Sequence, residues 1–350
     1  MLRLCVGRYT SLPEPPGIQV FDVDLSSGKA RLLCGQSESK NPSFLAFDHR
    51  NLYAVNEVME GSCVDTYLWS RDYDEIRHVG RLAVPGSAMC HICLWHNKKY
   101  LSVSNYMSGS FALCALEENG LPNGIVRLIQ YDGAGFDARG RQESAHVHST
   151  TLSPSGDVLF AADLGLDRLC VYPTSVSGGV LPDCIETISS QPGDGPRHMT
   201  FSQRQSCYYL LTEMGNRIYV FHYDRAARKS RNIQTVSTLA AGTSDKNMAA
   251  DIQIAKDGRF LYASNRGQDN LTGYQIDPNS GTLKEIGCFP LAGKGPRTFT
   301  ISENGCLVAI ACQESGDVLV YRRDNETGRI GQLLERIPVP SAAFVGFFQP

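Results

Sequence analysis

The stretch that decides the fold begins with Gly295-Pro-Arg-Thr-Phe-Thr-Ile-Ser, continues with Cys306-Leu-Val-Ala-Ile-Ala-Cys-Gln and ends with Val318-Leu-Val-Tyr. Each part is short and apolar, as a β-strand requires, and polar turns separate the parts. The same order returns from Gly195 and from Ala249. Earlier copies start at Asn41, Cys90 and His146. A strand unit repeated in this way predicts a β-propeller, in which each copy forms one blade.

Aligning the copies on the first strand gives equivalent positions roughly 50 residues apart. They are Ser43, His91, His148, Arg197, Ala250, Arg297 and Ser341. The last copy is completed from the other end of the chain: Ala342–Phe348 supplies a first strand, and Leu2–Val6 and Gly17–Phe21 supply the next two. The sequence therefore predicts an all-β, seven-bladed β-propeller with four antiparallel strands per blade. We expect one domain over residues 1–350, closed into a ring by the blade that the two termini share, which protects the sheet edges.

Composition and charge narrow the range of partners. The formal net charge is -3, and hydrophobic residues make up 42% of the chain. A near-neutral chain offers no field for nucleic acid or an anionic membrane, and no apolar run approaches the roughly 18 residues that span a bilayer. The first residues show no secretory signal, and the 12 cysteines are expected to be reduced. We expect a cytoplasmic monomer that binds neither nucleic acid nor membrane.

No metal and no cofactor are expected. Cys90-His-Ile-Cys93 suggests a metal site, but residues three apart on a strand point to opposite faces, and no second cysteine pair accompanies them. His146 and His148 share a strand face, a spacing that can hold a metal, but two ligands alone are weak evidence for a metal site. The chain has neither a glycine-rich phosphate loop between a strand and a helix nor a Gly-x-Ser-x-Gly nucleophile motif.

Polar residues interrupt the repeat where first strands begin and where second strands end, and in a propeller both places face the central channel. The first group, at the starts of first strands, is the set of aligned positions given above. The second group, at the ends of second strands, is Tyr9, Glu57, Asn105, Tyr106, Asp163, Glu213, Arg266 and Gln313. Charged side chains would be costly there in a dry interior, so the two groups predict a site for an anionic or polyhydroxy ligand. We favour an acid–base or hydrogen-bonding role for His148 and a supporting role for His146.

Structural explanations stay open for several of these residues. Arg297 could form a salt bridge between blades. Asp163 and Asp251 could equally be turn or inter-blade carboxylates. His91 and His198 are expected to be packed or surface histidines.

Motifs spread over essentially the whole chain carry a family resemblance. They are Val6-Gly-Arg-Tyr-Thr with Gly17-Ile, Asn41-Pro-Ser-Phe-Leu, Leu52-Tyr-Ala-Val-Asn-Glu57, Ser104-Asn-Tyr-Met-Ser-Gly-Ser110, His146-Val-His148, Gly195-Pro-Arg-His198, Glu213, Asp257-Gly-Arg-Phe-Leu-Tyr-Ala-Ser-Asn-Arg-Gly267 and Gly295-Pro-Arg-x-Phe. In these motifs the chain resembles the seven-bladed propeller lactonases, a family that contains bacterial 6-phosphogluconolactonase and fungal carboxy-muconate cyclase. The chain departs from the family at Gln253, where a histidine is common. The resemblance implies a site built from the matching positions His148, Arg197, Glu213 and Arg266, with Asn105 and Tyr106 nearby.

The function that the resemblance implies is hydrolysis of a sugar lactone, of the 6-phosphogluconolactone type, by metal-independent general acid–base catalysis in the central funnel. The catalytic candidates are His148, Glu213 and Arg197. His148 or Glu213 would take a proton from the attacking water, and an arginine would stabilise the oxyanion. The expected substrate-binding residues are Arg266, Asn105, Tyr106, His146, Arg297 and Gln313.

Two other functions stay open. A cycloisomerase would use the same acid–base pair to close or open a lactone on a muconate-like dicarboxylate, and the arginines suit that substrate equally well. A non-catalytic propeller would bind a protein partner on the same face, since fold does not fix function. The histidine, arginine and glutamate at channel-facing positions argue against the second alternative, because a protein-binding face would be expected to carry exposed aromatic residues instead.

Overall fold

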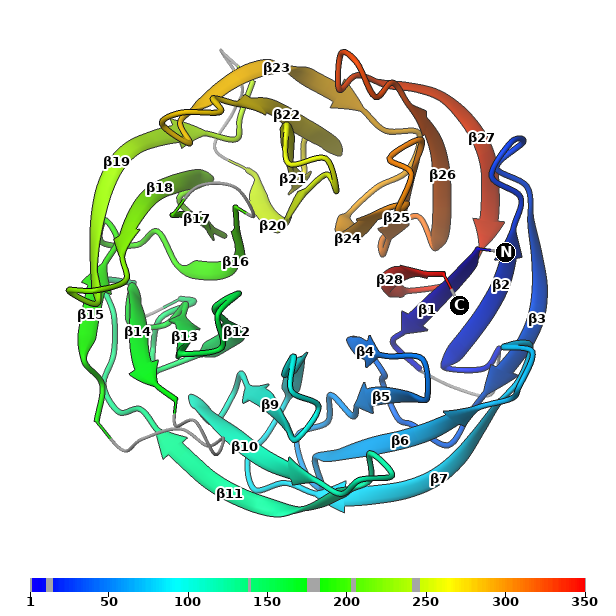
Figure 1. Ribbon diagram of the computed structural model, residues 1–350, viewed down its shortest axis with the longest axis horizontal. Coiled ribbons are helices and arrows are strands. Elements are labelled where there is room, and N and C mark those ends of the chain that lie inside the picture. Colours follow the sequence, from blue (N-terminus) through cyan, green and yellow to red (C-terminus); the bar gives the residue numbers. More distant parts are fainter. Residues whose placement is uncertain are drawn as a thin grey trace. The chain divides into compact units, whose positions relative to one another are not determined.

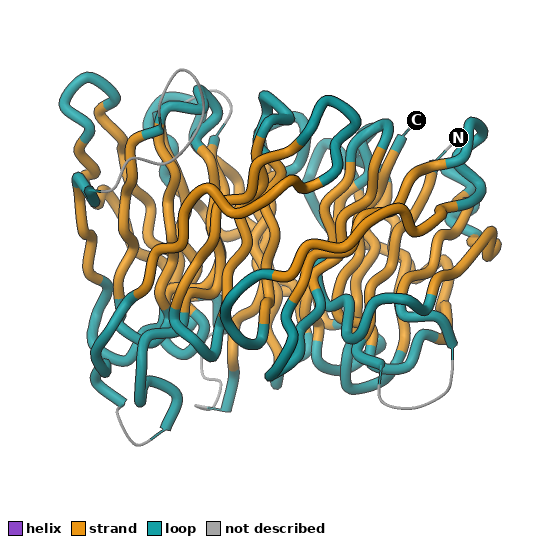
Figure 2. Tube along the Cα trace, turned by 90° about the horizontal axis from the view of Figure 1, so that it is seen from below, coloured by secondary structure: helices purple, strands orange, loops and turns teal. Residues whose placement is uncertain are grey.

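The computed structural model describes residues 2–10, 15–137, 140–174, 183–202, 206–240 and 246–349. Over these residues the chain forms 28 strands and no helix, arranged in seven four-stranded sheets (Figure 1, Figure 2). The sheets are the blades of a seven-bladed β-propeller, so the predicted all-β fold class is confirmed. No helix that could cross a membrane is present in these described ranges.

The chain divides into two compact units. Unit 1 comprises Met1–Arg8, Gln19–Leu33 and His198–Pro350, and unit 2 comprises Tyr9–Ile18 and Cys34–Arg197. Each unit is therefore built from segments that lie far apart in the sequence. The single domain expected over residues 1–350 stays a prediction.

Unit 2 holds three complete sheets, and in each of them the strands follow one another in chain order. The sheets are β4 (Leu45–Phe47), β5 (Asn51–Val55), β6 (Cys63–Trp69) and β7 (Ile76–Ala83); β8 (Met89–Leu94), β9 (Tyr100–Asn105), β10 (Ser110–Leu116) and β11 (Pro122–Gln130); and β12 (Val147–Leu152), β13 (Val158–Asp163), β14 (Arg168–Pro173) and β15 (Glu186–Ser189).

Unit 1 holds most residues of the other four sheets. Three of them run in chain order: β16 (Pro196–Phe201), β17 (Cys207–Thr212), β18 (Arg217–Asp224) and β19 (Lys229–Ser237); β20 (Met248–Ile254), β21 (Phe260–Arg266), β22 (Asn270–Ile276) and β23 (Leu283–Pro290); and β24 (Pro296–Ile301), β25 (Leu307–Cys312), β26 (Asp317–Arg323) and β27 (Ile330–Pro338). The fourth has the order β28 (Ala342–Phe348), β1 (Arg3–Arg8), β2 (Ile18–Val23) and β3 (Ala30–Gln36).

This last sheet joins the two ends of the chain. Strand β28 pairs antiparallel with β1, with Phe348 opposite Arg3 and Val345 opposite Val6 (Figure 1). The predicted first strand, Ala342–Phe348, has the bounds of β28. The blade shared between the termini is therefore confirmed.

Burial explains why these segments form sheets that are covered on both faces. Strands β1, β5, β13, β17 and β25 are buried at every residue. Their near-continuous apolar runs suit strands that have packed neighbours on both sides. The fourth strands, such as β11 and β27, are partly or fully exposed at almost every residue.

Apolar side chains fill the space between consecutive sheets within each unit. In unit 2, Phe111 of β10 and Leu159 of β13 belong to one buried cluster. In unit 1, Tyr262 of β21 and Ile310 of β25 belong to another. Because these clusters fix neighbouring sheets against each other, they also fix the strand ends that carry the polar residues.

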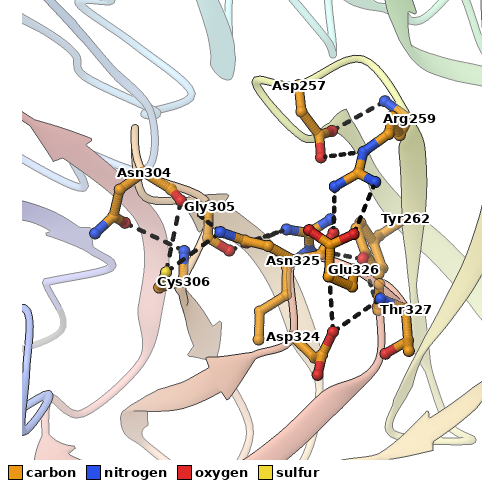
Figure 3. Close-up of polar contacts among 12 residues, drawn as sticks. Asp257, Arg259, Tyr262, Asn304, Gly305, Cys306, Asp324, Asn325, Glu326 and Thr327 are labelled. Atoms are coloured by element: carbon orange, nitrogen blue, oxygen red, sulfur yellow. Dashed lines mark hydrogen bonds and ion pairs between the residues drawn. The ribbon is translucent and has the colours of Figure 1, made fainter.

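A recurring tyrosine ties one sheet to the next at the turn between third and fourth strands. The hydroxyls of Tyr53 and Tyr209 each donate to a glycine carbonyl at 2.8 Å, and Tyr262 donates to Gly328 O at 2.5 Å. Gly328 has φ 71°, a left-handed conformation that glycine adopts without strain. The buried Arg323 donates from Nε to the Tyr262 hydroxyl at 2.7 Å. Figure 3 shows Tyr262 among the polar contacts of the neighbouring turns.

Replacing Tyr262 with phenylalanine is expected to lower the free energy of unfolding by about 1–3 kcal/mol, because Arg323 Nε would lose its acceptor in a buried place. The matched control is Tyr209→Phe, which removes only a hydrogen bond to the Gly281 carbonyl. We expect that control to cost about 0.5–1.5 kcal/mol. Urea unfolding of both variants measures the difference, and equal losses would contradict the role given to Arg323.

Candidate active site

The first strands of several sheets begin with a β-bulge, an extra residue that re-aims its side chain. The register shifts between Val147 and Ser149 in β12, and between Pro296 and Thr298 in β24. The extra residues are therefore His148 and Arg297. Bulges are over-represented beside active sites, and here they fall on two residues that the sequence proposes as site residues.

The register corrects two of the aligned positions by one or two residues. In β8 the shift lies between Met89 and His91, so the bulged residue is Cys90, while His91 pairs with Ser104. In β28 the unpaired residue is Ala343, so Ser341 was also aligned wrongly. The error arises because the spacing between repeats is counted across loops of variable length, which cannot fix a register to one residue.

Unit 2 brings three of the predicted residues together. The ring of Tyr106 stacks on His146 with centroids 4.4 Å apart and an interplanar angle of 8°. The same ring meets His148 edge-on, with centroids 5.6 Å apart. Both histidines are buried, so the position of each ring is set by packing.

Polar contacts fix His146 in its place beside Tyr106. Its Nδ1 lies 2.9 Å from the carbonyl oxygen of Tyr106, and its Nε2 lies 3.2 Å from a carboxylate oxygen of Glu143. Its backbone N–H donates to Asp163 Oδ1 at 2.8 Å. Burial raises the pKa of the Asp163 carboxyl. Asp163 is therefore a turn carboxylate that fixes the start of β12.

Asn105 and Tyr106 differ sharply although they are neighbours. Asn105 is fully buried, and its Nδ2 donates at 3.1 Å both to Pro85 O and to Ser110 Oγ. Asn265 is equally buried at the equivalent place in unit 1, where it donates to Thr238 O at 2.9 Å. The asparagine thus anchors the loop that enters the blade, whereas Tyr106 contacts the histidines.

Arg197 is held by its backbone in a Gly-Pro-Arg segment. The carboxylate of Asp167 accepts the N–H of Gly193 at 2.7 Å and of Gly195 at 2.8 Å. Ser149 Oγ donates to the carbonyl of Arg197 at 2.6 Å. Asp269 holds the second Gly-Pro-Arg segment in a similar way, because its carboxylate accepts the N–H of Gly295 at 2.8 Å.

Unit 1 places two predicted residues in an ion pair. Glu213 follows β17, and its Oε2 lies 2.9 Å from Nη2 of Arg266, the last residue of β21. The Glu213 side chain is 2% exposed and that of Arg266 is 12% exposed. Arg297 donates to Gln313 Oε1 at 3.3 Å, so these two predicted binding residues also contact each other.

The remaining candidates in unit 1 form a contact between sheets. His198 Nδ1 lies 2.9 Å from Asp251 Oδ1, and Gln253 donates to Asp251 Oδ2 at 3.2 Å. The Asp251 Oδ2 atom also accepts the N–H of Phe299. His198 is thus a packed histidine, as expected, and Asp251 is an inter-blade carboxylate.

Two residues that contact the cluster of Tyr106, His146 and His148 in unit 2 were not singled out from the sequence. Arg141 donates from Nη2 to the Tyr106 hydroxyl at 2.9 Å, and Glu143 contacts His146. Both belong to the loop between β11 and β12. The longest step of the repeat, between the second and third aligned positions, was the signal that a long loop precedes His148.

Metal ligation finds no support in the described residues, where no group of three or more histidine, cysteine, aspartate or glutamate side chains is arranged to hold an ion. Cys90 instead directs its thiol toward the carbonyl of His148, at 3.3 Å. The polar clusters described above are therefore organised by hydrogen bonds and ion pairs between side chains and backbone.

Fold and side chains together define a class: a seven-bladed propeller whose strand ends carry a histidine–tyrosine cluster, arginines and a buried glutamate. A family model described as lactonase, 7-bladed beta-propeller, matches residues 3–347. The chain belongs to this family.

Individual relatives agree with this placement. The 6-phosphogluconolactonase of Formosa agariphila is 30% identical, and the alignment covers 98% of each chain. The 6-phosphogluconolactonase of Bacillus subtilis is 28% identical over 98% of this chain and 97% of its own. The solved structure of a periplasmic gluconolactonase from Pseudomonas aeruginosa has a TM-score of 0.93 and 30% identity, covering 100% of this chain and 99% of its own. These relatives support lactone hydrolysis as the activity of the chain.

Proposed function

We propose that this protein hydrolyses a sugar lactone of the 6-phosphogluconolactone type by metal-independent general acid–base catalysis. The catalytic groups in this proposal are His148, Glu213 and Arg197. The binding groups are Arg266, Asn105, Tyr106, His146, Arg297 and Gln313. The observation that carries the proposal is the bulged His148, held edge-on by Tyr106 within a family of lactonases.

The proposed reaction requires a general base and a water molecule. His148 or Glu213 accepts a proton from water as the water oxygen adds to the ester carbonyl carbon, which forms a tetrahedral oxyanion. The ring C–O bond then breaks, and the leaving alkoxide takes the proton back from the base, so that a hydroxy acid results. Because a lactone is already a reactive ester, no metal is required to activate it.

The arginines supply positive charge where the substrate and the transition state are negative. In this proposal Arg197 stabilises the oxyanion, a contribution of about 3–4 kcal/mol in comparable sites. Arg266 and Arg297 bind the anionic end of the substrate, as planar guanidinium groups bind phosphates and carboxylates. Asn105 contributes through the loop it anchors at Pro85, because its own amide is fully buried.

A panel of lactones tests the proposal. Proton release at neutral pH would be followed with 6-phosphogluconolactone, unphosphorylated glucono-δ-lactone and a muconolactone, each against its spontaneous rate. We expect a rate proportional to enzyme concentration, with the largest kcat/KM for the phosphorylated lactone. Turnover of the muconolactone alone would favour the cycloisomerase alternative, and activity on none of the three would favour a non-catalytic propeller.

A further inference from the structure

A second polar cluster occupies unit 2, apart from the residues assigned above. The Tyr9 hydroxyl donates to Glu57 Oε2 at 2.7 Å, and the Ser43 hydroxyl donates to the same oxygen. Tyr9 follows β1, Glu57 lies just beyond β5, and Ser43 lies just before β4. Segments far apart in the sequence thus meet at one carboxylate.

These three residues stand at the same places in the repeat as the proposed site residues. Val55 N–H donates to the Phe44 carbonyl, which puts Ser43 at the position that Cys90 and His148 occupy in the next two blades. By the same register Tyr9 and Glu57 are equivalent to Tyr106. The cluster is therefore presented at the same end of its strands as the proposed catalytic residues.

The hydrogen bonds of Glu57 leave it able to bind a ligand. Both hydroxyls bond to Oε2, and among the described residues no donor bonds to Oε1 of this partly exposed side chain. Asp65 in the same sheet shows the contrast, because it is fully buried and both of its oxygens accept hydrogen bonds, for example from Arg81 at 2.7 and 2.9 Å. Hydrogen bonds from the protein therefore satisfy both oxygens of Asp65, whereas those to Glu57 fix the side chain through Oε2 and leave Oε1 available to a ligand.

The chemistry of a carboxylate decides which ligand fits. An ionised carboxylate only accepts hydrogen bonds, so it pairs with hydroxyl donors and repels phosphate and carboxylate groups. Hydrogen bonds to a charged acceptor are also stronger than those between neutral groups. A polyhydroxylated chain or ring is the ligand class that this site suits.

We propose that Glu57 is a binding residue for the hydroxyl groups of a polyhydroxylated lactone, with Ser43 and Tyr9 positioning its carboxylate. This inference rests on the proposed function and deepens it. Glu57 binds the hydroxyl-bearing part of the substrate. Specificity for sugar lactones over simple lactones follows from Glu57.

Substrates with and without hydroxyl groups test this inference. For Glu57→Gln we expect kcat/KM with glucono-δ-lactone to fall about 10–100-fold, the equivalent of one charged hydrogen bond, mainly through KM. With δ-valerolactone, which lacks ring hydroxyl groups, the change should stay under about twofold. Ser43→Ala and Tyr9→Phe should show smaller losses of the same selectivity. The control is Glu60→Gln, an exposed carboxylate three residues away that should change neither substrate.

A binding measurement separates this inference from the proposed function. Calorimetry with D-glucitol, a neutral polyol, should show weaker binding to Glu57→Gln than to the wild type. If no lactone is hydrolysed but glucitol binding depends on Glu57, the proposed function fails and the polyol site stands. If lactones are hydrolysed and Glu57→Gln treats glucono-δ-lactone and glucitol as the wild type does, the polyol site is overturned. An equal fall with δ-valerolactone would also overturn it.

Discussion

Replacing His148 with alanine is expected to lower kcat/KM for lactone hydrolysis by about 10²–10⁴-fold, the usual contribution of a positioned general base. The bulge in β12 aims this side chain, and the edge of Tyr106 fixes the ring. Alanine removes the imidazole but leaves the strand pairing intact. Initial rates of proton release, corrected for spontaneous hydrolysis, measure the loss.

A second histidine provides the control for this prediction. His91 lies on β8 one residue beyond the bulge and packs on Phe44 with ring centroids 4.4 Å apart. His91→Ala should keep wild-type activity to within a few-fold while losing some packing energy. His148→Ala at wild-type rate, or an equal loss in His91→Ala, would remove His148 from the catalytic set. The pH dependence of kcat/KM should also lose one limb in His148→Ala if the imidazole is the base.

The repeat was predictable because each blade is encoded locally. Apolar strands such as Leu307–Cys312 and turns such as Gly295-Pro-Arg recur along the chain, and the pattern needs no knowledge of distant contacts. The blade shared by the termini followed from the same pattern, since β28 supplied a first strand that lacked its partners. Local patterning and global fold agree here, as they do in sequences that fold reliably.

The register at which the first strands pair could not be predicted from the sequence. A bulge adds one residue to one strand and leaves the hydrophobic pattern almost unchanged, so His91 was taken for Cys90 in the alignment. Neighbouring residues on a strand point to different faces. A shift of one residue therefore decides whether a histidine packs on Phe44, as His91 does, or lies at the bulge.

Within the candidate site, the sequence identified residue types better than their contacts. Asn105 and Tyr106 were proposed together, yet one is buried against Pro85 and the other stacks on His146. The contacts of Arg141 and Glu143 come from a loop whose path no periodicity predicts. Distances between blades depend on how whole sheets pack, and the local pattern does not contain them.

The ion pair between Glu213 and Arg266 allows a test that separates stability from catalysis in unit 1, because a pair this deeply buried could serve either one. Removing one partner leaves an uncompensated charge, so Glu213→Leu is expected to cost about 3–5 kcal/mol of unfolding free energy. Replacing both residues by apolar ones of similar size is often neutral, so Glu213→Leu with Arg266→Met should recover most of that loss. Thermal and urea unfolding of the single and double variants give the coupling between the two side chains.

Activity should follow a different course from stability in the same variants. If Glu213 acts in proton transfer and Arg266 binds the substrate anion, the double variant folds well but hydrolyses lactone at least about 10²-fold more slowly than the wild type. A pair that only holds β17 and β21 together predicts the opposite, with activity returning as stability returns. Restored hydrolysis in the double variant would therefore assign Glu213 to the scaffold and leave His148 as the base. Persistent loss in a stable double variant would keep the Glu213–Arg266 pair in the site, because the lost rate could no longer be attributed to a weakened fold.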